Sequence, residues 1–184
     1  MFLMRWAPRP SYAWAGMLEA HLVILLMGVS GSGKTTVGQL LAAQLGWKFA
    51  DADDYHSAAN VEKMRNGVPL TDADRAPWLE ALRGLITGWI GAGKSAVLAC
   101  SALKKSYRDE LRVSPEVKLV YLCGTPRLLH ERLRARHGHY MTEQMLASQL
   151  ATLQEPKKDT EDAVIVDIAQ SPAEIVAEIR GKLS

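Results

Sequence analysis

Short apolar runs alternate along most of this chain with longer segments in which apolar residues recur at helical spacing. The short runs have the length and composition of strands that are buried on both faces of a sheet. They predict strands over residues 21–27, 47–51, 95–100, 117–122 and 163–167.

The longer segments predict helices, and several have residues suited to their ends. Gly46 ends the first helix, Gly67 and Pro69 follow the second, and residues 71–74 offer capping side chains before the third. Helices are predicted over residues 36–45, 58–66, 77–90, 126–136, 144–153 and 172–183.

Strands that alternate with helices in this way are typical of an α/β domain. We therefore expect a five-stranded parallel sheet with helices on both faces. Residues 21–184 predict a single domain, since neither a repeat nor an interdomain linker interrupts them. Residues 1–20 contain two prolines and two tryptophans without clear periodicity, and they predict a poorly ordered N-terminal extension.

The bulk composition narrows the range of partners and compartments. A chain of 184 residues with 48% hydrophobic residues is enough to fill the core of one domain. The net charge of +2 favours neither a nucleic-acid nor a membrane partner, and no apolar stretch has the length of a membrane span. Cys100 and Cys123 lie inside apolar runs, which favours buried free thiols and a cytoplasmic location over a disulfide.

The stretch over residues 28–35 has the most specific chemistry. It matches the phosphate-binding pattern G-x-x-x-x-G-K-[ST] at every fixed position. Glycines allow successive N–H groups to turn toward a polyphosphate, and the next helix adds the positive end of its dipole. Glycine-rich turns also join strands to helices in many folds, but lysine and threonine after a buried strand favour a nucleoside triphosphate. The predicted nucleotide-binding residues are Gly28, Val29, Ser30, Gly31, Ser32, Gly33, Lys34, Thr35 and Thr36.

Two further segments point to a small-molecule kinase among phosphate-loop proteins. Asp51 and Asp53 follow the second predicted strand, where an open α/β sheet places its ligands. A basic segment later in the chain predicts a mobile lid over about residues 134–143, which closes over bound ATP and excludes water. Arg132 and Arg136, one helical turn apart, are predicted to face the triphosphate from it. The alternative is a solvated helix end whose charges point to water.

Several blocks of the sequence resemble the gluconokinases of the shikimate-kinase-like group. They cover residues 27–36, 51–56, 67–79, 99–109 and 138–141, with 148–149 and 152–156. The blocks Cys-Ser-Ala-Leu-Lys-Lys and Pro-Leu-Thr-Asp-Ala-Asp-Arg are particularly specific, and the similarity extends from about residue 22 to 183. Tyr140 and Ser57 depart from the family pattern, where phenylalanine and proline are common.

This resemblance implies a P-loop kinase fold and transfer of the γ-phosphoryl group of ATP to the 6-hydroxyl of D-gluconate. It further implies that Lys34 holds the β- and γ-phosphates, while Thr35 and Asp51 hold Mg²⁺, the latter through water. Asp53 is expected to orient or deprotonate the substrate hydroxyl. Dimerisation is also an expectation that follows from the family.

The carboxylate of such a substrate calls for a cationic partner, best a planar guanidinium that forms two parallel hydrogen bonds. Arg75 and Arg108 are the candidates, and Asp72 and Asp74 offer Arg75 a structural ion pair instead. Of the adjacent lysines 104 and 105, one is expected to face the site and the other solvent. The remaining polar neighbours predicted around the substrate are Lys104, Lys63, His56 and His139.

The sequence leaves three alternatives open, which concern the role of His56, the position of the tryptophans and the class of protein. His56 suits a capping or packing role as well as a binding one, and Trp47, Trp78 and Trp89 are expected in the core rather than against adenine. A related kinase for another small hydroxy acid, such as shikimate, is disfavoured because residues 101–104 replace the glycine-rich turn of shikimate kinases. A nucleotide-binding regulator without turnover is disfavoured because the lysine, the threonine, the aspartates and the arginines are all present.

Overall fold

The computed structural model describes residues 21–135 and 143–183. Its centre is a sheet of five strands in the order β2-β3-β1-β4-β5, in which every neighbouring pair is parallel. This confirms the predicted α/β fold with a five-stranded parallel sheet. The strands are β1 (Val23–Met27), β2 (Lys48–Asp51), β3 (Ala96–Cys100), β4 (Val117–Cys123) and β5 (Ala163–Asp167).

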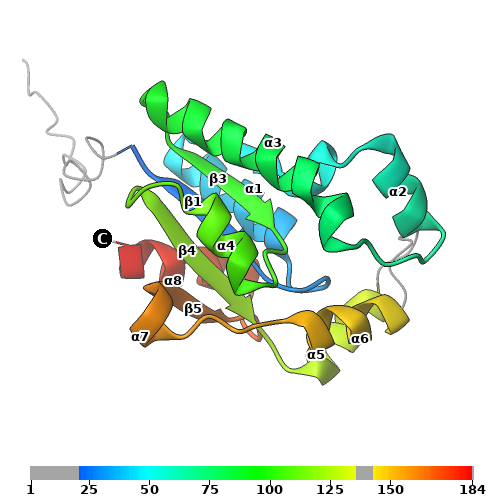
Figure 1. Ribbon diagram of the computed structural model, residues 1–184. Helices are drawn as coiled ribbons and strands as arrows, with labels where there is room; N and C mark the ends of the chain where they lie inside the picture. Colours follow the sequence, from blue (N-terminus) through cyan, green and yellow to red (C-terminus); the bar gives the residue numbers. More distant parts are fainter. Residues whose placement is uncertain (1–20, 136–142, 184) are drawn as a thin grey trace, which may run out of the picture.

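Helices cover both faces of the sheet (Figure 1). Alternate strand residues such as Leu25 and Leu119 join one core cluster with α3 and α4, and their neighbours Ile24 and Val120 join a second cluster with α1 and α8. This alternation follows from the two-residue period of a strand. The helices are α1 (Lys34–Leu45), α2 (Ala58–Arg65), α3 (Asp72–Gly91), α4 (Lys105–Leu111), α5 (Pro126–Arg134), α6 (Glu143–Thr152), α7 (Lys158–Glu161) and α8 (Pro172–Leu183), with a 3₁₀ turn over Ala52–Tyr55.

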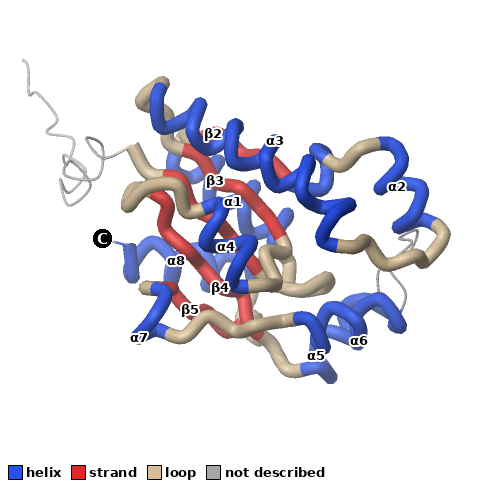
Figure 2. Tube along the Cα trace, in the orientation of Figure 1, coloured by secondary structure: helices blue, strands red, loops and turns tan. Residues whose placement is uncertain are grey.

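The ends of the strands are not equivalent. The chain leaves the carboxyl ends of β1, β2 and β3 into the phosphate loop, the Ala52–Tyr55 turn and the segment before α4. Figure 2 shows α2, α5 and α6 grouped beyond this same end of the sheet. An open α/β sheet binds its ligands at this edge.

The third helix starts earlier than its sequence predicts. α3 begins at Asp72 rather than near Pro77, because Thr71 and Asp74 form a reciprocal capping box. The Asp74 N–H donates to Thr71 Oγ1 at 3.1 Å, and the Thr71 N–H donates to Asp74 Oδ2 at 2.9 Å. Pro77 removes one helical N–H donor, and Ala73, whose carbonyl would have accepted it, lies on the exposed side. The short helices α4 and α7 and the 3₁₀ turn were not predicted.

The tryptophans belong to the core clusters, and the two cysteines are free thiols that differ in burial. Trp78 and Trp89 are buried in the cluster beneath α3, and Trp47 packs partly buried against the other cluster. Cys100 is a buried free thiol and Cys123 a half-buried one. None of the helices in the described part of the chain combines the length and the apolar composition that a membrane span requires.

Candidate active site

The phosphate loop joins the end of β1 to the start of α1, and two of its glycines have positions that disfavour a side chain, one through its backbone angles and the other through close neighbours. Gly33 caps α1 with φ 89°, in the left-handed region. A Cβ on Gly28 would lie 2.7 Å from Ser32 Oγ and 2.8 Å from the Leu122 carbonyl oxygen. The loop is therefore a tight backbone turn set at the N-terminus of a helix, which is suited to a polyphosphate.

The hydroxyl and the carboxylate predicted for Mg²⁺ are in direct contact. Thr35 Oγ1 donates to Asp51 Oδ2 at 2.7 Å, and Asp51 Oδ1 accepts the Asp53 N–H at 3.1 Å. Within residues 21–135 and 143–183, no three His, Cys, Asp or Glu side chains gather into a metal cage. Two hard oxygen groups beside a phosphate loop fit Mg²⁺, which binds through few carboxylates together with phosphates and water.

A cavity of about 490 Å³ opens beside this loop. It is lined by Ser30 and Lys34 of the phosphate loop and by Asp53 and His56 from the segment after β2. The remaining walls come from α2 and the loop after it, from α3, from the segment between β3 and α4, and from α6. One space therefore reaches both the nucleotide loop and three of the predicted substrate residues, Asp53, His56 and Arg75.

The electrostatic environment differs between Asp53 and His56. Loss of solvation raises the pKa of the Asp53 carboxyl, and the neighbouring Asp51 raises it further, while Lys34 opposes both. Burial lowers the pKa of His56 to about 4, and the charge of Arg75 adds to the effect. The His56 ring stacks on Trp78 with centroids 4.5 Å apart, so the histidine packs and lines the cavity as a neutral group.

Of the cations proposed for the substrate carboxylate, Arg75 alone lines the cavity among the described residues. Its Nη1 donates to the Leu70 carbonyl oxygen at 2.6 Å and lies 3.9 Å from Asp72. Lys104 is held by Asp72 instead, with its Nζ 2.6 and 2.7 Å from the two carboxylate oxygens. The structural ion pair considered for Arg75 is thus loose, whereas that of Lys104 is close.

Two other residues predicted to contact the substrate are bound to carboxylates of this chain. Lys63 donates to Asp74 Oδ1 at 2.6 Å and lies outside the lining of the cavity. Arg108 is completely buried, and its guanidinium binds both carboxylate oxygens of Glu161 at 2.6 and 2.7 Å. Its remaining hydrogen bonds go to backbone carbonyls, so Arg108 has no face toward a substrate.

Arg132, in the last turn of α5, lies near the phosphate loop. A Cβ on Gly33 would lie 3.7 Å from Arg132 Nη1, and Arg132 Nη2 donates to the Ile168 carbonyl oxygen at 2.6 Å. Arg136, His139 and most of the predicted lid fall outside the described residues. The predicted extension over residues 1–20 does so as well.

Several cavity residues were not predicted from the sequence. Gln149 of α6 accepts the Ser30 N–H at 2.7 Å, which ties α6 to the phosphate loop. Tyr107 of α4 lines the cavity, and its hydroxyl donates to Asp72. A signal for Gln149 existed in the Ser148-Gln149 pair of the family resemblance, although it carried no role. Ser101, Leu103, Met145, Ser148 and Thr152 also line the cavity.

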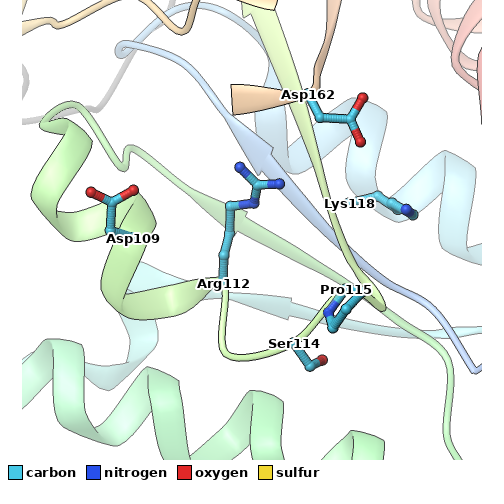
Figure 3. Close-up of a pocket in the computed structure, with 6 residues that line it drawn as sticks. All are labelled: Asp109, Arg112, Ser114, Pro115, Lys118 and Asp162. Atoms are coloured by element: carbon cyan, nitrogen blue, oxygen red, sulfur yellow. The ribbon is translucent and has the colours of Figure 1, made fainter. Parts of the chain in front are cut away.

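A second cavity, of about 520 Å³, lies at the amino ends of β4 and β5 (Figure 3). Its lining has two cations, Arg112 and Lys118, and two anions, Asp109 and Asp162. Arg112 is engaged by the Glu161 carbonyl oxygen at 2.6 Å, and Asp109 by Lys105 at 2.7 Å. Opposite charges therefore balance around this opening.

Comparisons with known proteins give one consistent group of relatives. The sequence model of a family described as an AAA domain matches residues 23–156. A mouse (Mus musculus) protein named probable gluconokinase is 45% identical over 180 residues, which cover 88% of this chain and 97% of the relative. The thermoresistant gluconokinase of Escherichia coli (strain K12) is 46% identical over 158 residues, covering 85% and 90%.

Solved structures show the same relationship. A gluconokinase from Sinorhizobium meliloti 1021 superposes with a TM-score of 0.80 and 41% identity, over 90% of this chain and 93% of that one. A shikimate kinase from Aquifex aeolicus has a TM-score of 0.54 and 19% identity over 88% and 96%. The second likeness shows a shared fold alone.

Proposed function

The chain belongs to the gluconokinase family, and on this premise we propose which of its residues perform the reaction. The protein is a kinase that transfers the γ-phosphoryl group of ATP to D-gluconate. The acceptor is the 6-hydroxyl, and the products are 6-phospho-D-gluconate and ADP. The related activity on shikimate is less supported, because the shikimate kinases resemble this chain in fold only.

The nucleotide is assigned to the phosphate loop. Its N–H groups and Lys34 surround the β- and γ-phosphates, and the positive end of α1 adds to the attraction. Arg132, near Gly33, supplies a further cation at the same place, and we assign the same role to Arg136 of the predicted lid. Phosphoryl transfer proceeds mainly through positioning and electrostatic stabilisation, so these groups are the centre of the mechanism.

Mg²⁺ is assigned to the Thr35 hydroxyl and the Asp51 carboxylate. The 2.7 Å contact between these two oxygens supports the assignment, since both are ligand types that Mg²⁺ prefers. When bound, the ion neutralises negative charge on the phosphates.

Gluconate is assigned to the far part of the same cavity. Arg75 supports its carboxylate, and Asp53 receives the hydrogen bond of the reacting hydroxyl and takes its proton during transfer. The raised pKa of Asp53 suits it to accept a proton. His56 lines the sugar-acid site as a neutral hydrogen-bonding group, and we propose that His139 approaches the substrate from the lid.

One observation carries this assignment. A single cavity is lined by Lys34 of the phosphate loop, by the Asp53 carboxylate and by the Arg75 guanidinium. Its volume of about 490 Å³ accommodates a six-carbon acid next to a phosphate group. A cytoplasmic location is proposed on the two free thiols, which are typical of reducing compartments. Dimerisation stays a prediction.

The test is a coupled ADP assay of the purified chain with a panel of sugar acids and hydroxy acids. We expect turnover with D-gluconate to exceed turnover with shikimate, glucose and glucuronate by at least about a hundredfold in kcat/KM, because the buried polar groups of a matched site reject a poorly matched substrate. A preference for shikimate would overturn the assignment. ATP binding without turnover on any member of the panel would favour a regulatory protein.

A further inference from the structure

The buried ion pair of Arg108 and Glu161 lies directly behind one wall of the active-site cavity. Arg108 is 0% exposed and Glu161 5% exposed. Besides its two bonds to Glu161, the guanidinium donates from Nη1 to the carbonyl oxygens of Ala102 and Leu103, both at 3.1 Å. One side chain therefore joins α7 to the backbone that follows β3.

That backbone segment forms part of the cavity wall. Ser101 and Leu103 line the cavity, as does Tyr107, which precedes Arg108 in α4. Ala102 between them has φ 44°, a left-handed conformation that a residue with a Cβ seldom adopts. A strained loop keeps such a conformation only when its surroundings hold it there.

Gln154, two residues after the end of α6, restrains the same segment. The Gln154 N–H donates to the Leu103 carbonyl oxygen at 2.9 Å, and Gln154 Oε1 accepts the Lys105 N–H at 2.7 Å. The Ala102 carbonyl oxygen, in contrast, receives its side-chain hydrogen bond from Arg108. Removing the guanidinium thus removes a hydrogen bond from the strained residue itself.

A buried ion pair of this kind is weak support for a stability role. The cost of removing both charges from water offsets much of their attraction, and replacement by apolar side chains of similar size is often neutral for stability. We propose that Arg108 and Glu161 are positioning residues, which hold the Ser101–Leu103 wall in the geometry that the sugar acid requires. The proposal rests on the assignment of gluconate to this cavity.

The test compares stability and kinetics in the double variant Arg108→Met/Glu161→Met. We expect this variant to stay folded, while its KM for gluconate rises roughly tenfold or more, because a misplacement of about 1 Å in a site costs up to a hundredfold. The KM for ATP is expected to stay within about twofold, since the hydrogen bonds of Arg108 go to Glu161 and to the carbonyl oxygens of Ala102 and Leu103. A loss of folded protein alone would reduce kcat and leave both KM values unchanged.

A second variant covers the case in which the double variant does not fold. Arg108→Lys keeps the positive charge opposite Glu161, but one nitrogen cannot span the carboxylate and both carbonyls. We expect a several-fold rise in the KM for gluconate, smaller than that of the double variant. Gluconate KM values within about twofold of wild type in the folded variants, or an equal rise in the KM for ATP, would overturn the proposal.

The variant Arg75→Ala separates this inference from the assignment on which it rests. If gluconate occupies the cavity, Arg75→Ala raises the KM for gluconate whatever the role of Arg108. A wild-type KM in Arg75→Ala would overturn the assignment of the cavity. A raised KM in Arg75→Ala together with wild-type KM values in the Arg108 variants would overturn the positioning role alone.

Discussion

The two cavities of this protein have similar volumes, about 490 and 520 Å³, and lie at opposite ends of the same parallel sheet. The first lies where β1, β2 and β3 end, and the second lies where β4 and β5 begin. Each has lysine, arginine and aspartate in its lining. Neither size nor residue type therefore separates a catalytic cavity from a surface hollow.

The direction of the strands does separate them. At the carboxyl ends, the loop after β1 leads into the N-terminus of α1, so backbone N–H groups and a helix dipole meet side chains from neighbouring strands. At the amino ends, Arg112 is held by a backbone carbonyl, and the two aspartates balance the two cations. The direction of the strands therefore concentrates positive electrostatic potential at the carboxyl ends of the sheet. The charges around the cavity at the amino ends nearly cancel.

The largest difference in activity is expected between variants that remove the lysine of each cavity. We expect Lys34→Ala to lower kcat roughly a thousandfold, because loss of one positioned charge in a phosphoryl-transfer site costs several kcal/mol of transition-state stabilisation. The measurement is steady-state turnover in the coupled assay, with a thermal melt to establish that the variant is folded. A folded Lys34→Ala protein with kcat within threefold of wild type would contradict the assignment of the phosphate loop.

Asp53 in the first cavity and Asp162 in the second allow a matched comparison of activity and of its dependence on pH. We expect Asp53→Asn to lower kcat/KM roughly a hundredfold, less than Lys34→Ala, because a loose transition state requires little proton removal. Asp162→Asn in the second cavity removes the same charge and should leave activity unchanged, since asparagine tolerates the left-handed φ of 46° at that position.

The pH profile sharpens the test of Asp53. Burial and Asp51 raise the pKa of this carboxyl, and the ionised form is the one that accepts a proton. Activity should therefore fall as pH is lowered through the pKa of this carboxyl, because protonation removes the group that accepts the proton. This fall should persist in Asp162→Asn and vanish in Asp53→Asn. Persistence in both variants would assign it to another group.

The sequence could predict those parts of the site that are local. The phosphate loop is contiguous, and its contact with Asp51 follows from two strands that end at the same edge of a parallel sheet. The five strands are contiguous apolar runs, and their central positions agree with the structure. The start of α3 was missed because proline suits the first turn of a helix, while the capping box at Thr71 has the larger effect.

The parts that could not be predicted depend on partners far along the chain. Arg75 and Arg108 are alike as residues, and what separates them is Glu161, which follows Arg108 by 53 positions. Gln149 reaches the phosphate loop across 119 positions. The hydrophobic periodicity of the sequence does not predict such contacts between distant residues, because they form only when the helices pack on the sheet. A polar residue near a motif is thus a weaker indication of a site than the motif itself.

The smallest effect is expected at Lys118, the counterpart of Lys34 in the second cavity. Lys118→Ala removes a cation of the same type from a hollow of similar volume. If the concentrated field at the carboxyl ends of the strands is what makes a site, this variant should keep kcat and both KM values within about twofold of wild type. It should also keep its melting temperature within a few degrees, since Lys118 is only partly buried in β4 and most single substitutions away from special features cost about 1 kcal/mol or less. The same coupled assay and melt used for Lys34→Ala apply, so expression, purity and substrate stocks are matched.

A loss of activity at Lys118 comparable to that at Lys34 would mean that the amino ends of β4 and β5 take part in the reaction, and the contrast between the two ends of the sheet would have to be abandoned.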